Sequence, residues 1–277
     1  MTPTTIAIGD LTVARLGFGA LRLDAATAGE RAASTAILRR AVELGVTFID
    51  TADSYGLGRN EELIAEALHP YPADLVIGTK AGQCHPGDEW IPLGRPEYLR
   101  QQAELSLRRL RVDCIDLFQL HRIDPTVPLT DQVGALKRLQ DEGKIRHIGL
   151  SEVTIAQLTQ ATEIAPIVGV QNLYNLHHRR SERLLEHCEQ LGIVFIPWLP
   201  VQPSARAGAG EPIAEIADRL GISTTQVALA WLLHRSPVML PIPGTSKLAH
   251  LEENLAAAHI QLSDADLSAL DPVPMHV

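Results

Sequence analysis

Three apolar runs of the sequence end in polar residues that could together perform proton chemistry. The first run ends in Asp50 and is followed by Tyr55, the second ends in Lys80, and the third ends in His121. A buried lysine stabilises a neighbouring tyrosinate, and an aspartate beside the lysine holds the ammonium charge in place. A tyrosine whose pKa is lowered in this way can deliver a proton near neutral pH, and a histidine can hydrogen-bond an oxygen on which negative charge develops. These residue types suit the reduction of a carbonyl group by a hydride supplied from elsewhere.

Each of the four residues also has a purely structural interpretation. Asp50 could cap the turn after its strand, and Tyr55 could be a loop residue with a solvated hydroxyl. Lys80 could extend its ammonium group to solvent, and His121 could hydrogen-bond the backbone within the core. Their positions at the ends of consecutive runs favour a shared function over four separate structural roles.

The runs belong to a repeated pattern that predicts a parallel sheet, because unbroken apolar segments suit strands that are covered on both faces. The expected strands are 46–50, 75–80, 115–121, 145–151, 167–172, 194–199 and 238–243, with a weaker one at 14–19. Apolar residues recur at helical spacing within 37–44, 99–110, 227–233 and 248–255, and Pro96 and a capping box at Ser223-Thr224-Thr225-Gln226 mark two helix starts. Successive repeats are about 32 residues long, which is the size of a βα unit.

Eight such units predict an α/β fold, a (β/α)8 TIM barrel that forms one domain over residues 1–277. A doubly wound Rossmann sheet would carry G-x-G-x-x-G after its first strand, and the glycine pairs 17/19 and 56/58 lack the third glycine. The Gly-, Pro- and Ala-rich segment 202–212 follows a strand, so it is expected to be an active-site loop and not a linker. Barrel chemistry lies at the C-terminal ends of the strands, where the four polar residues fall.

The composition excludes several classes of function. The chain is 45% hydrophobic and carries a net charge of −9 without any Lys/Arg-rich run, which argues against disorder and against a nucleic-acid partner. It lacks a run of about 18 apolar residues that could span a membrane, and its first residues do not form a secretory signal. Three widely spaced cysteines do not suggest a disulfide framework, and they predict a cytoplasmic location.

Several motifs resemble those of the aldo-keto reductase family. The catalytic signatures of that family resemble Phe48-Ile49-Asp50-Thr51-Ala52 with Tyr55, Gly78-Thr79-Lys80, and Gln119-Leu120-His121. Further matches are Gly143-Lys144-Ile145-Arg146, Ile148-Gly149-Leu150-Ser151, Val170-Gln171-Asn172-Leu173-Tyr174-Asn175, Ile242-Pro243-Gly244-Thr245 and Glu253-Asn254. The segments Arg122-Ile123-Asp124-Pro125 and Phe195-Ile196-Pro197-Trp198 look like the bacterial, pyridoxal reductase-like branch.

The resemblance implies a barrel that binds NADPH across its rim and transfers hydride from the nicotinamide to a substrate carbonyl carbon. Tyr55 would be the general acid, Lys80 the group that adjusts its pKa, Asp50 the anchor of Lys80, and His121 the group that orients the carbonyl. The implied substrate-binding residues are Tyr55, Trp90 and His121. The implied cofactor-binding residues are Gly19, Ala20, Asp50, Ser151, Glu152, Gln171, Trp198, Leu199, Gly244, Thr245, Lys247, His250, Glu253 and Asn254.

Three positions depart from the family pattern. Glu152 stands where Asn or Asp is usual. Its longer charged side chain changes an expected contact to the carboxamide group of the nicotinamide. Gly244 stands where many members have a Lys, and His250 stands where many have an Arg, and both of those cations are directed at the 2′-phosphate of NADPH. Lys247 is then the cation that remains nearby. Because phosphate is held best by Arg or Lys, the expected preference for NADPH is weakened and NADH becomes a possible cofactor.

Other interpretations stay open at this stage. The chain could be an NADPH-binding regulatory subunit with little catalysis, or an unrelated barrel that uses Pro243-Gly244-Thr245 to bind phosphorylated substrates. Three histidines, at 177, 178 and 187, lack an acid or Cys at tight ligand spacing, so no metal site is predicted. The modest loop after residue 199 and the short tail after Leu270 predict an open pocket that accepts several small carbonyl substrates, including aromatic or pyridine aldehydes. The oligomeric state is not indicated.

Overall fold

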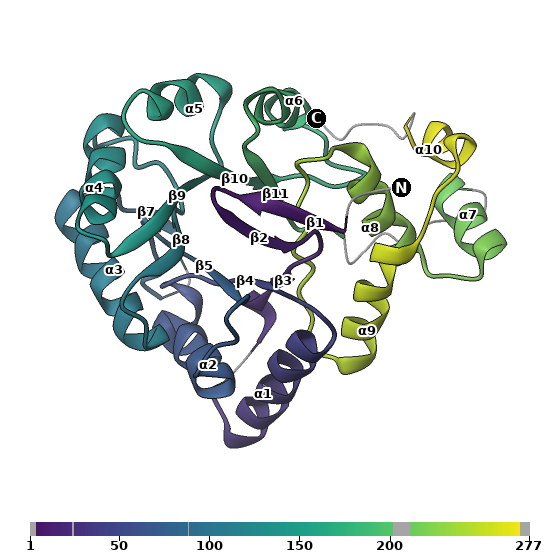
Figure 1. Cartoon of the computed structure of the whole chain (residues 1–277), viewed down its shortest axis with the longest axis horizontal. Coiled ribbons are helices and arrows are strands. Elements are labelled where there is room, and N and C mark those ends of the chain that lie inside the picture. The colour runs from purple at the N-terminus through teal and green to yellow at the C-terminus, as the bar shows by residue number, and fades with distance from the viewer. Residues whose placement is uncertain (1–3, 24, 88, 202–210, 272–277) are drawn as a thin grey trace.

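The computed structural model describes residues 4–23, 25–87, 89–201 and 211–271. Seven parallel strands curl around a central axis in the order β11-β10-β9-β8-β5-β4-β3, as Figure 1 shows. Their bounds are β3 Phe18–Gly19, β4 Phe48–Asp50, β5 Val76–Ala81, β8 Ile115–Leu120, β9 Ile145–Ser151, β10 Ile167–Leu173 and β11 Val194–Trp198. The predicted TIM barrel is confirmed.

The eighth position of the barrel is filled by 238–243, which was predicted to be a strand. Its pairing is reduced to a single parallel bridge, Phe195 to Met239. Pro241 and Pro243 have no backbone N–H to donate to a neighbouring strand, so their backbone can only accept hydrogen bonds through the carbonyl oxygens. Gly17 N–H donates to the Pro241 carbonyl at 2.9 Å, which joins this segment to the first strand. The barrel therefore closes without a regular eighth strand.

The predicted strand 14–19 is divided in the structure. Its first residue ends β2 (Leu11–Ala14), which pairs antiparallel with β1 (Thr5–Ile8), and only β3 joins the barrel. Figure 1 shows this hairpin lying across the barrel. Ile8 and Val13 are buried in one cluster with Phe48 and Leu117, so the hairpin covers the apolar interior at one end.

Helices surround the sheet, and their starts follow from local sequence. The α-helices are α1 Ala28–Glu43, α2 Arg59–Leu68, α3 Pro96–Leu110, α4 Leu129–Asp141, α5 Ile155–Thr162, α6 Glu182–Leu191, α7 Pro212–Leu220, α8 Thr224–Arg235, α9 Leu248–Ala256 and α10 Asp264–Leu270. The predicted capping box of α8 is present, because Ser223 accepts from Gln226 N and Gln226 accepts from Ser223 N. Pro96 occupies the first turn of α3, as predicted.

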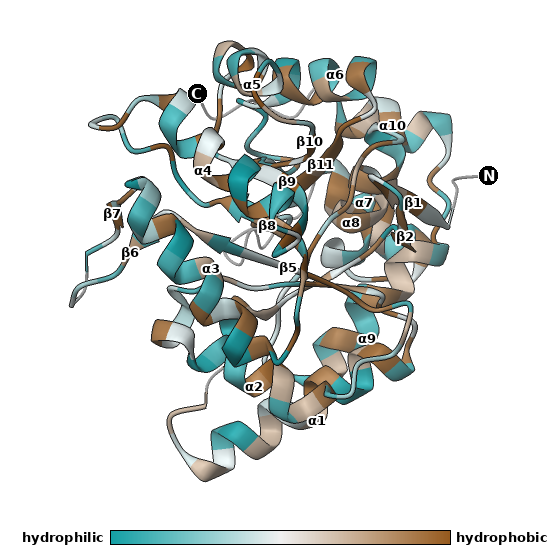
Figure 2. Cartoon of the chain, turned by 60° about the vertical axis from the view of Figure 1, so that its left-hand side comes forward, coloured by the Kyte–Doolittle hydropathy of each residue, from teal (hydrophilic) through white to brown (hydrophobic). Residues whose placement is uncertain are grey.

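Figure 2 shows β10 and β11 coloured mainly as hydrophobic, whereas the visible face of α3 is hydrophilic. This distribution buries both faces of the parallel sheet and exposes the polar faces of the helices. No helix of the four described segments is long and apolar enough to cross a membrane. Residues 202–210 of the expected active-site loop, and 272–277 of the tail, lie outside the described residues.

Candidate active site

Asp50 and Lys80 form a buried ion pair on neighbouring strands. Asp50 ends β4, and Lys80 lies near the end of β5, which pairs with β4. The Lys80 Nζ atom donates to Asp50 Oδ2 at 2.6 Å and to the Thr51 carbonyl at 2.7 Å. The lysine side chain is completely buried and does not line the cavity. Lys80 thus acts from behind the cavity wall, as the buried lysine expected from the sequence.

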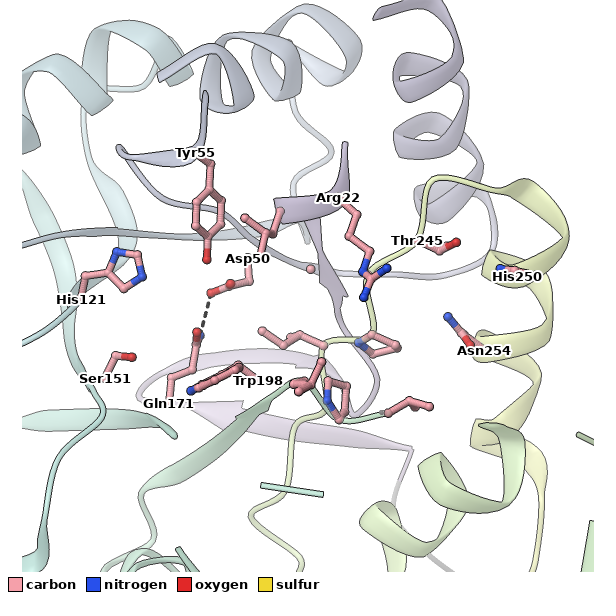
Figure 3. Close-up of a pocket in the computed structure, with 18 of the residues that line it drawn as sticks. Arg22, Asp50, Tyr55, His121, Ser151, Gln171, Trp198, Thr245, His250 and Asn254 are labelled. Atoms are coloured by element: carbon pink, nitrogen blue, oxygen red, sulfur yellow. Dashed lines mark hydrogen bonds between the residues drawn. The ribbon is translucent and has the colours of Figure 1, made fainter. Parts of the chain in front are cut away.

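Two glutamine side chains satisfy the second oxygen of Asp50. Gln171 Nε2 donates to Asp50 Oδ1 at 2.9 Å, and Gln119 Nε2 donates to the same atom at 3.2 Å (Figure 3 shows the Gln171 bond). These bonds hold a buried carboxylate in one orientation. Gln119 was not predicted as a site residue, although a buried polar residue near the C-terminal end of a mostly apolar strand is a signal that could have identified it.

Tyr55 begins a tight turn that brings its ring over the buried ion pair. The turn is η2 (Tyr55–Gly58), and Gly56, Leu57 and Gly58 all have left-handed φ angles, of 56°, 54° and 92°. Glycine adopts this conformation without a steric penalty, which explains two glycines here. The Tyr55 hydroxyl points toward the carboxylate of Asp50 in Figure 3.

The pKa of Tyr55 differs from the sequence expectation. Burial raises the pKa of the phenol, while the positive charge of Lys80 lowers it, and burial has the larger effect. The Lys80 Nζ atom lies 5.2 Å from the centroid of the tyrosine ring. The net pKa is above the usual value and not below it, so the expectation of a lowered pKa is wrong. A raised pKa keeps the phenol protonated at neutral pH, which is the form that a proton donor requires.

His121 follows β8 and is held in the neutral state. Burial, with the nearby charges of Lys80 and Arg122, lowers its pKa well below the usual value. Its Nδ1 atom is buried and has no hydrogen-bond partner among the residues described. The ring centroid lies 6.0 Å from that of Tyr55. A neutral imidazole beside a phenol can donate a hydrogen bond to a substrate oxygen without competing for the phenol proton.

A cavity of about 820 Å³ joins this cluster to the N-terminal end of α9. The predicted residues that line it are Gly19, Asp50, Tyr55, Trp90, His121, Ser151, Gln171, Trp198, Leu199, Gly244, Thr245, His250, Glu253 and Asn254. Ala20, Lys80, Glu152 and Lys247 were also predicted and do not line it. Residues that the sequence did not identify as site residues also face the cavity, namely Leu21, Arg22, Gln83, Arg122, Pro200, Val201, Thr225, Ile242 and Pro243.

Trp90 forms one wall near the catalytic cluster. It lies between the short strands β6 (Gln83–Cys84) and β7 (Ile91–Pro92), in the loop after β5. Its ring centroid is 4.0 Å from that of His85 and 6.4 Å from that of His121. The indole therefore gives the cavity an apolar surface beside the imidazole.

Glu152 does not line the cavity, and its carboxylate lies beside the N–H edge of the Trp198 indole. Its Oε1 atom accepts from Trp198 Nε1 and from the backbone N of Leu173, each at 2.7 Å, and Oε2 accepts from Arg180 Nη2 at 2.8 Å. The carboxylate thus has three partners and fixes the indole that lines the cavity. This geometry gives Glu152 a positioning role in place of the carboxamide contact implied by the family resemblance.

Gly19 and Gly244 lie so close together that neither position has room for a side chain. A Cβ atom on Gly244 would lie 2.5 Å from the Gly19 carbonyl oxygen, and one on Gly19 would lie 2.7 Å from the Ile242 carbonyl oxygen. The absence of a lysine at position 244 is therefore explained by backbone packing.

The far end of the cavity is suited to an anion. The first turn of α9 has no side-chain cap on its N–H groups, and Thr245 and His250 line the cavity beside it. Free N–H groups at a helix start bind phosphate. Arg22, from the short helix η1 (Ala20–Arg22), lies between Asp50 and Thr245 in Figure 3 and adds a cation that the sequence did not predict.

Asp53 is a buried carboxyl close to the cluster whose pKa is raised to about 7. Burial is the main cause, and the negative charge of Glu61 adds to it. Its Oδ1 atom has no partner within the described ranges, and Tyr98 donates weakly to Oδ2 at 3.5 Å. The stability that the protonated acid provides is complete below about pH 4 and is lost as pH rises through about 7.

We therefore expect Asp53→Asn to raise the melting temperature by several degrees at about pH 8, where the variant removes a buried charge, and to change it little at about pH 4. Differential scanning fluorimetry at both values measures the effect. Asp113→Asn, which changes an exposed carboxylate, is the matched control. An equal change in melting temperature at both pH values would show that ionisation of Asp53 does not limit the stability of the protein.

Comparisons with known proteins agree with this geometry. Residues 15–273 match the model of the aldo/keto reductase family. The chain is 50% identical over 272 residues to a Schizosaccharomyces pombe protein named as an uncharacterized oxidoreductase, covering 96% of this chain and 89% of that one. It is 38% identical over 284 residues to pyridoxine 4-dehydrogenase of Escherichia coli, covering 99% of both. A Klebsiella pneumoniae aldo/keto reductase solved with NADP and acetate superposes with a TM-score of 0.85 at 30% identity, covering 99% of this chain and 97% of that one.

Proposed function

The chain belongs to the aldo/keto reductase family of oxidoreductases, and from this membership we propose that it reduces aldehydes or ketones to alcohols with NADPH. The observation that carries the proposal is the single cavity that has Tyr55 and His121 at one end and the uncapped start of α9 at the other. The first end offers a proton donor and a hydrogen-bond donor to a carbonyl oxygen. The second offers free backbone N–H groups for a phosphate.

The four side chains have separate tasks in this proposal. Tyr55 holds the proton that the carbonyl oxygen receives, and the charge of Lys80 eases its departure, because that charge stabilises the phenolate. Asp50 keeps the ammonium group in place through the 2.6 Å bond. Neutral His121 donates a hydrogen bond to the same carbonyl oxygen and orients the carbonyl carbon.

The residues that line the rest of the cavity fit a dinucleotide. A bound reduced nicotinamide would supply the hydride. Ser151 and Gln171 offer polar groups to its carboxamide, and Trp198, held by Glu152, offers an aromatic face for stacking. Thr245, His250 and Asn254 line the phosphate end. Gly19, Leu199, Gly244 and Glu253 complete the wall, whereas Ala20 and Lys247 do not line the cavity.

Arg22 and His250 are the cavity-lining groups that we propose to favour NADPH over NADH. Lys247 directly precedes α9 but does not line the cavity, so it does not compensate for the missing family cations. The preference is expected to be moderate, with NADH also accepted.

Three free cysteines, one of them exposed, support the cytoplasm as the location.

We expect Arg22→Gln to raise the dissociation constant for NADPH by about tenfold, because it removes a charge-assisted contact to a phosphate. Titration of cofactor fluorescence measures the constant. Arg108→Gln, which removes the same charge from the exposed side of α3, should leave it unchanged. If the two variants bind NADPH equally well, Arg22 does not contact the cofactor.

The substrate proposed is a small or aromatic aldehyde. Similarity to pyridoxine 4-dehydrogenase makes pyridoxal one candidate, and Trp90 provides an aromatic wall beside His121. An NADPH oxidation assay with pyridoxal, nitrobenzaldehyde and methylglyoxal tests the activity. Formation of the alcohol supports a reductase, whereas tight NADPH binding without turnover of any aldehyde would support a regulatory subunit.

A further inference from the structure

Arg122 is a second cation at the catalytic end of the cavity, and no step proposed above uses it. It follows His121 and is half-buried against the cavity wall. Its charge acts on both catalytic groups, because it lowers the pKa of Tyr55 and that of His121. Because Arg122 lines the same cavity as Tyr55 and His121 and donates to the His121 carbonyl, its guanidinium group lies at the end of the cavity where a substrate carbonyl would bind.

The guanidinium of Arg122 has no carboxylate partner within the described part of the chain. Its Nη1 atom donates to the His121 carbonyl at 2.6 Å and to Ser151 Oγ at 3.1 Å, which leaves its Nε and Nη2 atoms without partners among those residues. The nearby carboxylate of Glu152 already accepts from Trp198, Leu173 and Arg180.

Two other buried or half-buried cations of the barrel are paired with carboxylates, and Arg15, which has none among the described residues, does not line this cavity. Lys80 is paired with Asp50, and Arg109 is paired with Glu61 at 2.6 Å. Arg122 thus leaves an excess positive charge in a partly desolvated wall, where opposite charges attract more strongly than in water. A planar guanidinium with two free donors is well suited to a carboxylate.

We propose that Arg122 selects carbonyl substrates that carry a carboxylate group, so that the preferred substrate is an aldehyde or ketone with a negative charge elsewhere in the molecule. The proposal rests on the reductase function proposed above. The carboxylate would bind the free edge of Arg122 while the carbonyl oxygen lies between Tyr55 and His121. The indole of Trp90 would cover the apolar part that joins the two groups.

A pair of aldehydes that differ in charge tests this selection. 4-Formylbenzoate carries a carboxylate, and its methyl ester places a neutral group of similar shape at the same position. We expect kcat/KM of the unmodified enzyme to be about 10- to 100-fold higher for the carboxylate. Arg122→Gln should remove most of that ratio by slowing the carboxylate far more than the ester, Arg122→Lys should retain part of it, and Arg108→Gln should leave it intact.

A binding measurement keeps the inference testable whether or not turnover is observed. 4-(Hydroxymethyl)benzoate and its methyl ester are titrated into NADP-saturated protein by calorimetry. At least about tenfold tighter binding of the carboxylate, lost in Arg122→Gln, supports the inference even if the reductase proposal fails. Equal binding of the two compounds to the unmodified protein would overturn it. An equal loss of kcat/KM for both aldehydes in Arg122→Gln would also overturn it, because Arg122 would then serve the reaction centre and not the substrate charge.

Discussion

Tyr55→Phe is expected to lower kcat for aldehyde reduction by at least about a hundredfold and to leave the dissociation constant for NADPH within about twofold. The substitution removes the hydroxyl that holds the transferable proton and changes the volume of the ring very little. The phenol proton is well placed for transfer because burial keeps Tyr55 protonated while Lys80 stabilises the phenolate that forms. The loss is therefore expected in kcat and not in cofactor affinity.

Tyr71→Phe is the control for this substitution. The hydroxyl of Tyr71 donates to the Leu110 carbonyl at 2.7 Å and does not line the cavity. Steady-state NADPH oxidation and fluorescence titration, made on both variants, separate the chemical step from binding. A Tyr55→Phe enzyme with near-normal kcat would mean that another group supplies the proton.

Lys80→Met is expected to reduce both stability and activity. The substitution leaves Asp50 buried without its counter-ion, and breaking a buried pair in this way costs about 3 to 5 kcal/mol. It also removes the charge that favours the Tyr55 phenolate, so kcat should fall by about a hundredfold or more. Chemical denaturation and steady-state kinetics measure the two effects.

The double variant Asp50→Asn/Lys80→Met separates structure from catalysis. It removes both charges, so most of the lost stability should return while kcat stays low. Lys137→Met is the control, because Lys137 is paired with Asp141 on the exposed side of α4 and its loss should change little. Recovery of kcat along with stability in the double variant would show that Lys80 has only a structural role.

The sequence was sufficient to predict the barrel and to bring Asp50, Tyr55, Lys80 and His121 together. The reason is geometric, since parallel strands place their C-terminal ends at one rim, and these residues follow three adjacent strands. The start of α8 was also predictable, because its capping box is local. Structural features that depend on near neighbours in sequence, or on a repeat of strands, can be predicted from the sequence alone.

Features that depend on distant contacts were not predictable. Pro241 and Pro243 weaken the eighth strand because they have no N–H to donate to the first strand, whose Gly17 and Gly19 donate to their carbonyls. Glu152 is used by Trp198 and Arg180, which are far from it in sequence. Arg22 reaches the cavity because a short helix follows β3. None of these partners is marked by a local pattern.

The pKa of Tyr55 illustrates the same limit for electrostatics. The positive charge of Lys80 was evident from the sequence, and its direction of effect was correct. The extent to which the Tyr55 side chain is buried was not evident from the sequence, and this burial decides the direction of the net change in its pKa. A catalytic pKa therefore requires the surroundings of the group as well as the identity of its charged neighbour.

The most direct test of the reductase proposal is a single-turnover reaction with NADPH that carries deuterium at the transferable position of the nicotinamide. The unmodified enzyme should convert an aldehyde to an alcohol with one deuterium on the former carbonyl carbon, detected by mass spectrometry. Tyr55→Phe, saturated with the same cofactor, should form almost none in the same time. Binding of the cofactor by the unmodified enzyme with no deuterated alcohol from any aldehyde of the screen would show that the protein does not reduce carbonyl groups by hydride transfer.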